Sequence, residues 1–150
     1  MDADAVARSV LDDVAYMVLS TVDDDGRPWA SPVWFAADDH RDLYWMSSPE
    51  AEHSRNIAAH PDVAIVVFDS TRPPATRQAV YMRAAAERVD DEEAVAHGVA
   101  VFTRDSRAQG LGPLTFDEVT GDAAFRLYRA RVLEHWVLDE DHDVRRAARP

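Results

Sequence analysis

Hydrophobic and polar residues follow two different periods along the chain, and the change of period marks the predicted elements. Near the N-terminus, Val6, Val10, Leu11 and Val14 recur at helical spacing, which predicts an amphipathic helix within residues 1–14. The next stretch alternates as a strand does. It predicts a hairpin with strands at 16–22 and 29–36 and a turn at Asp24-Asp25-Gly26.

Further along the chain, segments with a strand pattern alternate with segments that have a helix pattern. The segment "DVAIVVFDS" is so uniformly apolar that it predicts a strand buried on both faces. A helix after Asp90 as N-cap and a short helix in the capping box "TFDE" are also expected. The other predicted elements are a strand at 42–48, a helix from Pro49 to Pro61, a strand at 78–89, a final strand at 123–140 and a fraying polar tail at 140–150.

This order of elements predicts a mainly β (α+β) fold in one domain covering residues 1–150. The first three strands follow one another through tight turns, so the sheet is expected to be antiparallel. Tight turns are too short for the crossover connections of a parallel βαβ arrangement. The prediction is therefore a small antiparallel β-barrel with peripheral helices.

Composition narrows the classes of function. The net charge of −12 argues against nucleic acid and anionic membranes as partners. The chain has no cysteine, no apolar run of about 18 residues and no signal-peptide pattern, so a cytoplasmic protein is expected. His53 and His60 lie about two helical turns apart, and the pattern contains no metal-ligand constellation.

The stretch "MSSPEAEHSRNIAAHP" carries the most chemistry, and its pattern leaves two interpretations open. Ser48 with Pro49 is a favourable helix start, so Ser48 serves as a simple N-cap in one interpretation. In the other, hydroxyls at the strand-to-helix junction and His53 hold a phosphate. Glu50 and Glu52 oppose an anion there.

The segments "PVWF", "LYWMSS", "HSRNIAAHPDVAIVVFD" and "RQAVYMRAAAERV" together resemble the pyridoxamine 5′-phosphate oxidase-like family of flavin-binding split barrels. The resemblance runs from about Tyr16 to Val89 and resumes in the last strand. It implies a split β-barrel that forms a homodimer and holds FMN at the subunit interface. It also implies a two-electron redox reaction on a small organic substrate.

The resemblance also assigns candidate cofactor-binding residues. Their predicted roles are these: Ser31, Pro32 and Val33 run along the flavin, Ser47, Ser48 and His53 contact its phosphate, Gln78 reaches the cofactor, and Trp136 comes from the second subunit. No catalytic residue is marked out, as expected where the cofactor performs the hydride chemistry.

The chain departs from the oxidase itself. Glu52 stands where the oxidase has a basic residue, His53 replaces a lysine, and the C-terminal substrate-binding motif is missing. A divergent FMN-dependent oxidoreductase is therefore the leading hypothesis. Two alternatives remain open, a reductase that uses the deazaflavin F420 and a non-catalytic protein that binds haem or another small ligand.

Overall fold

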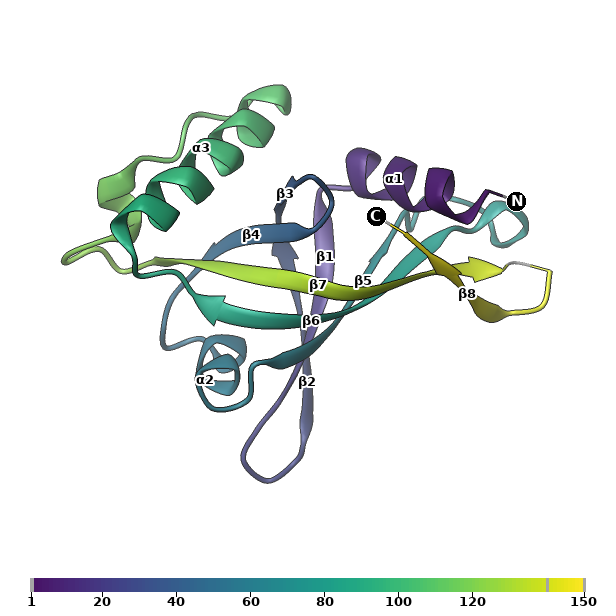
Figure 1. The fold of residues 1–150 in the computed structure, drawn as a ribbon, viewed down its shortest axis with the longest axis horizontal. Helices are drawn as coiled ribbons and strands as arrows, with labels where there is room; N and C mark the ends of the chain where they lie inside the picture. The colour runs from purple at the N-terminus through teal and green to yellow at the C-terminus, as the bar shows by residue number, and fades with distance from the viewer. Residues whose placement is uncertain (1, 140, 150) are drawn as a thin grey trace.

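Eight strands and three α-helices make up the part of the chain that the computed structural model describes, residues 2–139 and 141–149 (Figure 1). In chain order they are α1 (Ala3–Asp13), β1 (Tyr16–Val22), β2 (Pro28–Trp34), β3 (Ala36–Asp38), β4 (Asp42–Ser47), α2 (Glu52–Ala59), β5 (Asp62–Phe68), β6 (Ala79–Arg88), α3 (Glu92–Ala108), β7 (Arg126–Asp139) and β8 (Val144–Ala148), with short 3-10 helices at Pro74–Thr76 and Phe116–Val119.

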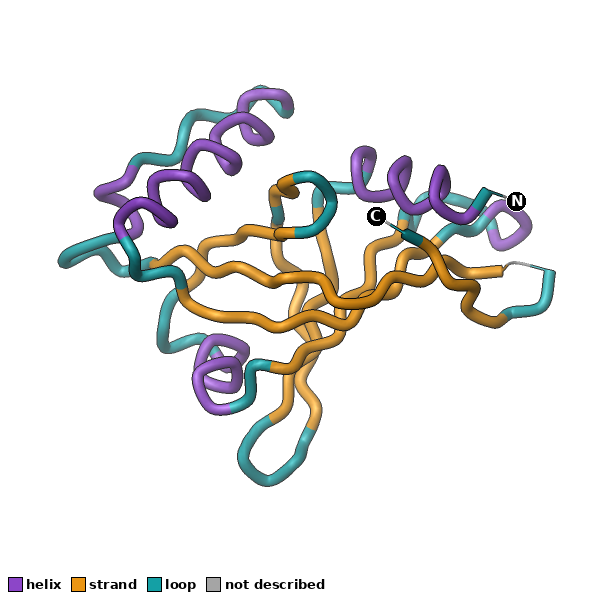
Figure 2. Tube along the Cα trace, viewed as in Figure 1, coloured by secondary structure: helices purple, strands orange, loops and turns teal. Residues whose placement is uncertain are grey.

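All strands belong to one antiparallel sheet with the order β2-β1-β5-β6-β7-β4-β3. The long β7 pairs with β4 along its first half and with β8 near its C-terminal end. The two ends of the order, β2 and β3, are separated in sequence by Phe35 alone, so the sheet must curl back on itself (Figure 2). The predicted antiparallel split barrel with peripheral helices is confirmed.

The core lies on the inner face of this curled sheet. Trp45 is fully buried there and stacks on Tyr128 with ring centroids 5.7 Å apart. α1 and α2 contact the sheet from two different sides (Figure 1). A second, smaller core forms between α3 and strands β4 and β7, and it includes Tyr44 and Leu127.

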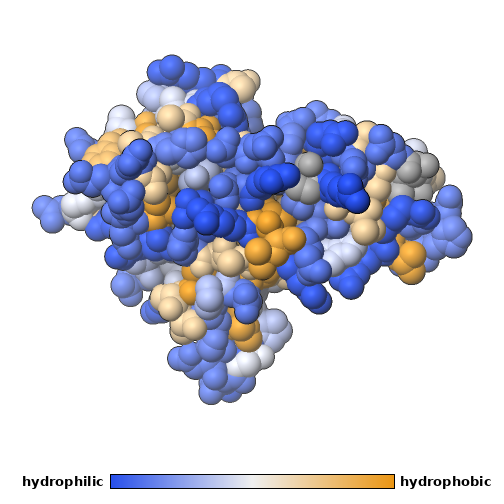
Figure 3. All heavy atoms as spheres, in the orientation of Figure 1, coloured by the Kyte–Doolittle hydropathy of each residue, from blue (hydrophilic) through white to orange (hydrophobic). Residues whose placement is uncertain are grey.

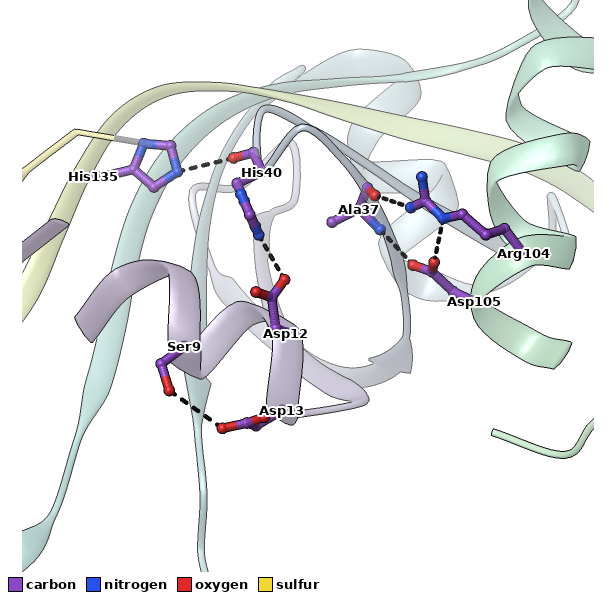
Figure 4. Close-up of polar contacts among 8 residues, drawn as sticks. All are labelled: Ser9, Asp12, Asp13, Ala37, His40, Arg104, Asp105 and His135. Atoms are coloured by element: carbon purple, nitrogen blue, oxygen red, sulfur yellow. Dashed lines mark hydrogen bonds and ion pairs between the residues drawn. The ribbon is translucent and has the colours of Figure 1, made fainter. Parts of the chain in front are cut away.

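The β3–β4 turn is fastened to three other elements (Figure 4). The His40 ring contacts Asp12 of α1 at 2.6 Å, and its carbonyl oxygen contacts the His135 ring of β7 at 3.2 Å. On the other side, the Ala37 carbonyl accepts a hydrogen bond from Arg104 of α3. These contacts hold α1, α3 and β7 in place relative to the end of the curled sheet.

Two predictions from the sequence were wrong in detail. β5 is buried on one face only, because Val63, Ile65 and Val67 alternate with more exposed residues. Part of the 140–150 tail forms β8 instead of fraying, since it pairs with β7 from Val144 to Ala148. Residues 140 and 150 themselves lie outside the described residues.

Smaller differences concern where elements begin and end. α3 is capped by the carboxylate of Asp91, not Asp90, and it continues to Ala108. The strand predicted at 29–36 ends at Trp34. The capping box is present, with the Thr115 N–H and hydroxyl both donating to the Glu118 carboxylate. None of the described helices is long and apolar enough to cross a membrane.

Gly98 allows α3 to approach the sheet closely. A Cβ atom built at this position would lie 2.5 Å from the Leu127 side chain and 2.8 Å from the Tyr44 ring. We expect Gly98→Ala to lower the free energy of unfolding by about 1 to 2 kcal/mol, after the gain in helix propensity is counted. Urea unfolding measures this. Gly112→Ala, with no atom within 4 Å, is the matched control, and equal stability of the two variants would contradict the prediction.

Candidate functional site

The His53 imidazole joins two strands that are distant in the sheet order. Its Nδ1 lies 3.2 Å from the Ser31 hydroxyl on β2, and its Nε2 lies 2.8 Å from the Ser47 hydroxyl at the end of β4. Trp29 in turn donates its indole N–H to the Ser31 oxygen at 3.0 Å. A neutral imidazole protonated on Nε2 is compatible with all three contacts. Three predicted cofactor residues, Ser31, Ser47 and His53, therefore form one cluster.

Burial controls the charge of this cluster. Ser47 is buried and His53 is half-buried, and the loss of water around the imidazole lowers the pKa of His53. Near pH 7 the ring is therefore mainly neutral. It presents hydrogen-bond donors and acceptors and gains a positive charge when the pH falls or an anion approaches.

α2 carries His53 and is anchored from its inner side. The buried Asn56 amide donates a hydrogen bond to the Thr21 hydroxyl of β1 at 3.0 Å, and Ile57 packs into the main core. Asn56 thus ties the helix to a strand of the sheet. This buried contact fixes the rotation of α2 about its axis and so aims His53 at the two serines.

The cationic side chain of α2 points elsewhere. Arg55 lies 3.6 Å from the Glu52 carboxylate and 3.9 Å from that of Glu50, on the exposed side of the helix. It does not contact the Ser31–His53–Ser47 cluster in the described structure. The donors available to an anion in this cluster are consequently two hydroxyls and an imidazole, without a permanent cation.

Ser48 and Pro49 do not start the helix, so the predicted N-cap was wrong. α2 begins at Glu52 with Ala51 as N-cap, and no side chain caps it. The Ser48 hydroxyl instead accepts a hydrogen bond from the Glu50 N–H at 3.1 Å, which stabilises a turn between β4 and α2. Ser48 therefore lies beside the cluster but makes none of its contacts.

The remaining predicted residues fall in three other places. Val33 is buried in the core. Pro32 and Trp136 lie on the outer face, at opposite ends of one cross-strand row that passes through Val18, Val66 and Tyr81. Four strand spacings separate the ends of this row, or about 19 Å.

Gln78 lies just before β6, at a separate polar pocket of about 240 Å³. The pocket is also lined by Asp139, His142 and Arg146. Hydrogen bonds from the Arg146 and His142 side chains lower the pKa of Asp139 to about 2. Within one chain, Gln78 therefore does not contact the Ser31–His53–Ser47 cluster.

Two features of the site had no signal in the sequence. Trp29 is half exposed, and its indole N–H donates to the Ser31 hydroxyl, a contact that no sequence pattern indicates. Arg145 lies over the Trp136 ring, with 4.2 Å between the guanidinium carbon and the ring centroid. That contact depends on β8, which the sequence did not predict. The described residues contain no cluster of histidines and carboxylates that could hold a metal ion.

Comparison with known proteins places these features in a family. A family model described as pyridoxamine 5′-phosphate oxidase matches residues 3–138, which is most of the chain. The chain belongs to the pyridoxamine 5′-phosphate oxidase-like family. This agrees with the curled antiparallel sheet and with the resemblance found in the sequence.

Two relatives named pyridoxine/pyridoxamine 5′-phosphate oxidase align with parts of the chain. The protein from Azorhizobium caulinodans is 36% identical over 90 residues, covering 60% of this chain and 41% of the relative. The protein from Burkholderia lata is 38% identical over 52 residues, covering 35% and 24%. The matches therefore span less than half the length of these relatives.

Solved structures share the fold. A haem-binding protein from Mycobacterium smegmatis has a TM-score of 0.72 at 24% identity, covering 91% of this chain and 54% of that chain. A haem storage protein from Vibrio cholerae has a TM-score of 0.67 at 21% identity, covering 89% and 92%. An F420 reductase has a TM-score of 0.62 at 27% identity, covering 85% and 94%.

The burial of His53 leads to a prediction about pH. We expect NMR titration of its ring protons to give a pKa below the ordinary value of about 6.5. The unfolded chain then binds a proton at this residue more readily than the folded chain does. The stability that His53 contributes is therefore present above about pH 6.5 and is lost as the pH falls through its lower folded pKa.

Urea unfolding of the wild type and His53→Gln at pH 7.5 and 5.5 isolates this contribution, because His135, whose pKa burial also lowers, is present in both proteins. The wild type should lose more stability on acidification than the variant. A His53 pKa at or above 6.5, or an equal loss in both proteins, would count against the buried, neutral imidazole.

Proposed function

We propose that this protein is an FMN-dependent oxidoreductase that acts on a small organic substrate as a homodimer. The observation that carries the proposal is the Ser31–His53–Ser47 cluster, in which two hydroxyls and an imidazole converge from β2, β4 and α2. Membership of the pyridoxamine 5′-phosphate oxidase-like family supports the choice of FMN.

The cluster suits the phosphate of FMN in its chemistry. Ser31 and Ser47 can turn their hydroxyl hydrogens toward phosphate oxygens, and His53 donates from a ring nitrogen once it releases a serine. An approaching dianion favours protonation of His53, which adds charge assistance to that hydrogen bond. Glu52 precedes His53 in α2, and its negative charge makes the site less favourable for an anion. A pair of basic residues at these two positions would bind an anion better.

When FMN is bound, its isoalloxazine ring supplies the two-electron chemistry. The role of the chain is to hold the phosphate at Ser31, Ser47 and His53, and to orient the ring along β2 at Pro32. The fully buried core behind Val33 keeps water from the back of this strand.

The outer face of β5 is the argument for a second copy of the chain. β5 lies in the interior of the sheet order. Of its four outward residues, Ala64, Val66 and Phe68 are apolar, and only Asp62 at the start of the strand is charged. Phe68 is 45% exposed and Tyr16 is 59% exposed, and both line one surface pocket of this face. Figure 3 shows a further apolar patch over β7, one of several among the mostly hydrophilic residues of the face in view. A matching sheet face from another copy would bury such residues.

A dimer also accounts for the separation of Pro32 and Trp136. About 19 Å separates them within one chain, which is too far for both to line the same part of one flavin. If two copies pack through their outer faces, Trp136 of the partner subunit can approach the flavin held by the first. The proposal therefore assigns Ser31, Pro32, Ser47 and His53 to one subunit and Trp136 to the other.

A reductase that uses F420 is the second candidate, and the F420 reductase at 27% identity favours it. F420 carries an acidic tail, which the net charge of −12 disfavours. Competition between FMN and F420 for the purified protein distinguishes the two. A haem-binding role is less favoured, because the haem-binding and haem storage proteins, at 24% and 21% identity, share the fold alone with this chain.

His53 provides the main test of FMN binding. We expect His53→Gln to weaken the affinity for FMN by about tenfold or more, because a charge-assisted hydrogen bond to the phosphate is lost. Quenching of flavin fluorescence on binding measures the dissociation constant. His60→Gln is the matched control at the C-cap of the same helix, since His60 contacts Asp24 and not the cluster.

The pH dependence gives an independent check. Affinity for FMN should increase as the pH falls from 8.5 to 5.5 in the wild type, and this increase should be smaller in His53→Gln. No measurable FMN binding by the wild type would refute the proposed cofactor. Equal losses in the two histidine variants would refute the proposed phosphate site.

The proposed dimer predicts a molar mass in solution of about twice the 16.8 kDa of the chain. Val66→Arg should produce a monomer, because it places a charge at the centre of the outer face. Light scattering after gel filtration measures the mass, and circular dichroism verifies the fold. Leu111→Arg, at an exposed leucine beyond α3, should stay dimeric. A monomeric wild type would rule out the dimer.

A further inference from the structure

Trp136 lies between two arginines on the outer face of the sheet. The Arg145 guanidinium carbon is 4.2 Å from the centroid of its ring, and that of Arg83 is 5.7 Å away. The two arginines come from different strands, since Arg83 belongs to β6 and Arg145 to β8. Pairing of both strands with β7 brings them to the same tryptophan.

The two arginines differ in their other contacts. Arg83 lies 3.4 Å from the Glu134 carboxylate, its neighbour across β6 and β7. Arg145 makes no ion pair with a carboxylate among the described residues, and its guanidinium is exposed. A guanidinium lying on an aromatic face keeps the N–H donors at its edge available. Stacking on Trp136 therefore orients the Arg145 cation and leaves the edge of its guanidinium available to a ligand.

A surface pocket of about 320 Å³ adjoins this stack. Its apolar part is formed by side chains of β5, β6, β7 and β8, including Val66, Tyr81, Leu138 and Val144. Arg145 lines the same pocket. The pocket therefore offers an apolar surface for the body of a small molecule and one guanidinium for an acidic group.

The surrounding charges select the acidic group. Two residues that line the pocket are already in ion pairs. Arg83 pairs with the Glu134 carboxylate, and Asp143 pairs with Arg77 at 3.3 Å. These carboxylates repel a dianion such as a phosphate monoester, while one free guanidinium matches one carboxylate with two parallel hydrogen bonds. We propose that the pocket beside Trp136 binds small monocarboxylates with an apolar body, and that Arg145 is the residue that recognises the carboxylate.

Binding at this pocket does not require the flavin. Its role as the substrate site does rest on the proposed function, because the proposed dimer brings Trp136 to the flavin of the other subunit. The ligand class would then be the substrate class.

The test uses the full-length protein without added cofactor, in 150 mM salt. The probe is 2-naphthoate, and its neutral analogue 2-naphthamide is the comparison. Shifts of the tryptophan indole N–H signals in NMR spectra report binding, and Trp136→Phe identifies the signal of Trp136. We expect naphthoate to bind more tightly than naphthamide and to shift the Trp136 signal. Arg145→Gln should weaken the affinity for naphthoate by about tenfold and leave the affinity for naphthamide unchanged.

Two matched variants separate recognition from general charge. Arg107→Gln removes one positive charge from α3, far from β8 in the fold, and should leave naphthoate binding unchanged (Figure 1). Arg83→Gln should have a smaller effect than Arg145→Gln, because Arg83 is already paired. Equal affinity for the two probes, or equal weakening by Arg145→Gln and Arg107→Gln, would overturn the proposal. Failure of FMN binding would leave the result at Arg145 intact and would overturn only the proposed function.

Discussion

The curl of the sheet is the constraint on which the rest of the structure depends. Ser31 lies on β2 and Ser47 on β4, and five strand spacings separate these strands in the order of the sheet. A flat sheet would place them about 24 Å apart. One imidazole nevertheless contacts both hydroxyls, at 3.2 and 2.8 Å, because the sheet curls until its two ends meet. The single residue between β2 and β3 leaves the chain no room for another arrangement.

The same curl gives the sheet an inner and an outer face with different requirements. The inner face is filled by the core, and α2 lies against it through Asn56 and Ile57. Beyond Asp62 the outer face of β5 is apolar too, and Ala64 and Phe68 are exposed on it. The proposed dimer would cover these residues, since contiguous exposed apolar surface often marks an interaction site.

Electrostatics distinguishes two places in an acidic protein. At the Ser31–His53–Ser47 cluster, charge is conditional, because burial lowers the pKa of His53 and leaves it neutral until an anion or a proton arrives. At Trp136, charge is permanent, because the group that lies on the ring is the guanidinium of Arg145. The first suits a phosphate held by neutral donors, and the second suits a single carboxylate. These two places carry the proposals about cofactor and ligand.

The sequence by itself determined most element types, the antiparallel order of the first strands and the family, but not the strands β3 and β8. Period-two and helical patterns, the hairpin at Asp24-Asp25-Gly26 and the capping box at Thr115–Glu118 are local, so nearby residues suffice to predict them. Local signals also misled: Ser48 with Pro49 indicates a helix start, yet the chain makes a turn first and α2 begins at Glu52. Local propensity cannot weigh where the curled sheet needs the helix to lie.

Only the tertiary structure decided which candidate residues meet. Ser31, Ser47 and His53 come together because strands far apart in the sheet order are brought to one end, whereas Gln78 and Trp136 lie elsewhere in the same chain. The exposed face of β5 could not be distinguished from a buried one in the sequence, since an apolar residue looks the same whether its own chain or another covers it. Arg145 reaches Trp136 only because β8 pairs with β7, and such pairing depends on contacts across the fold.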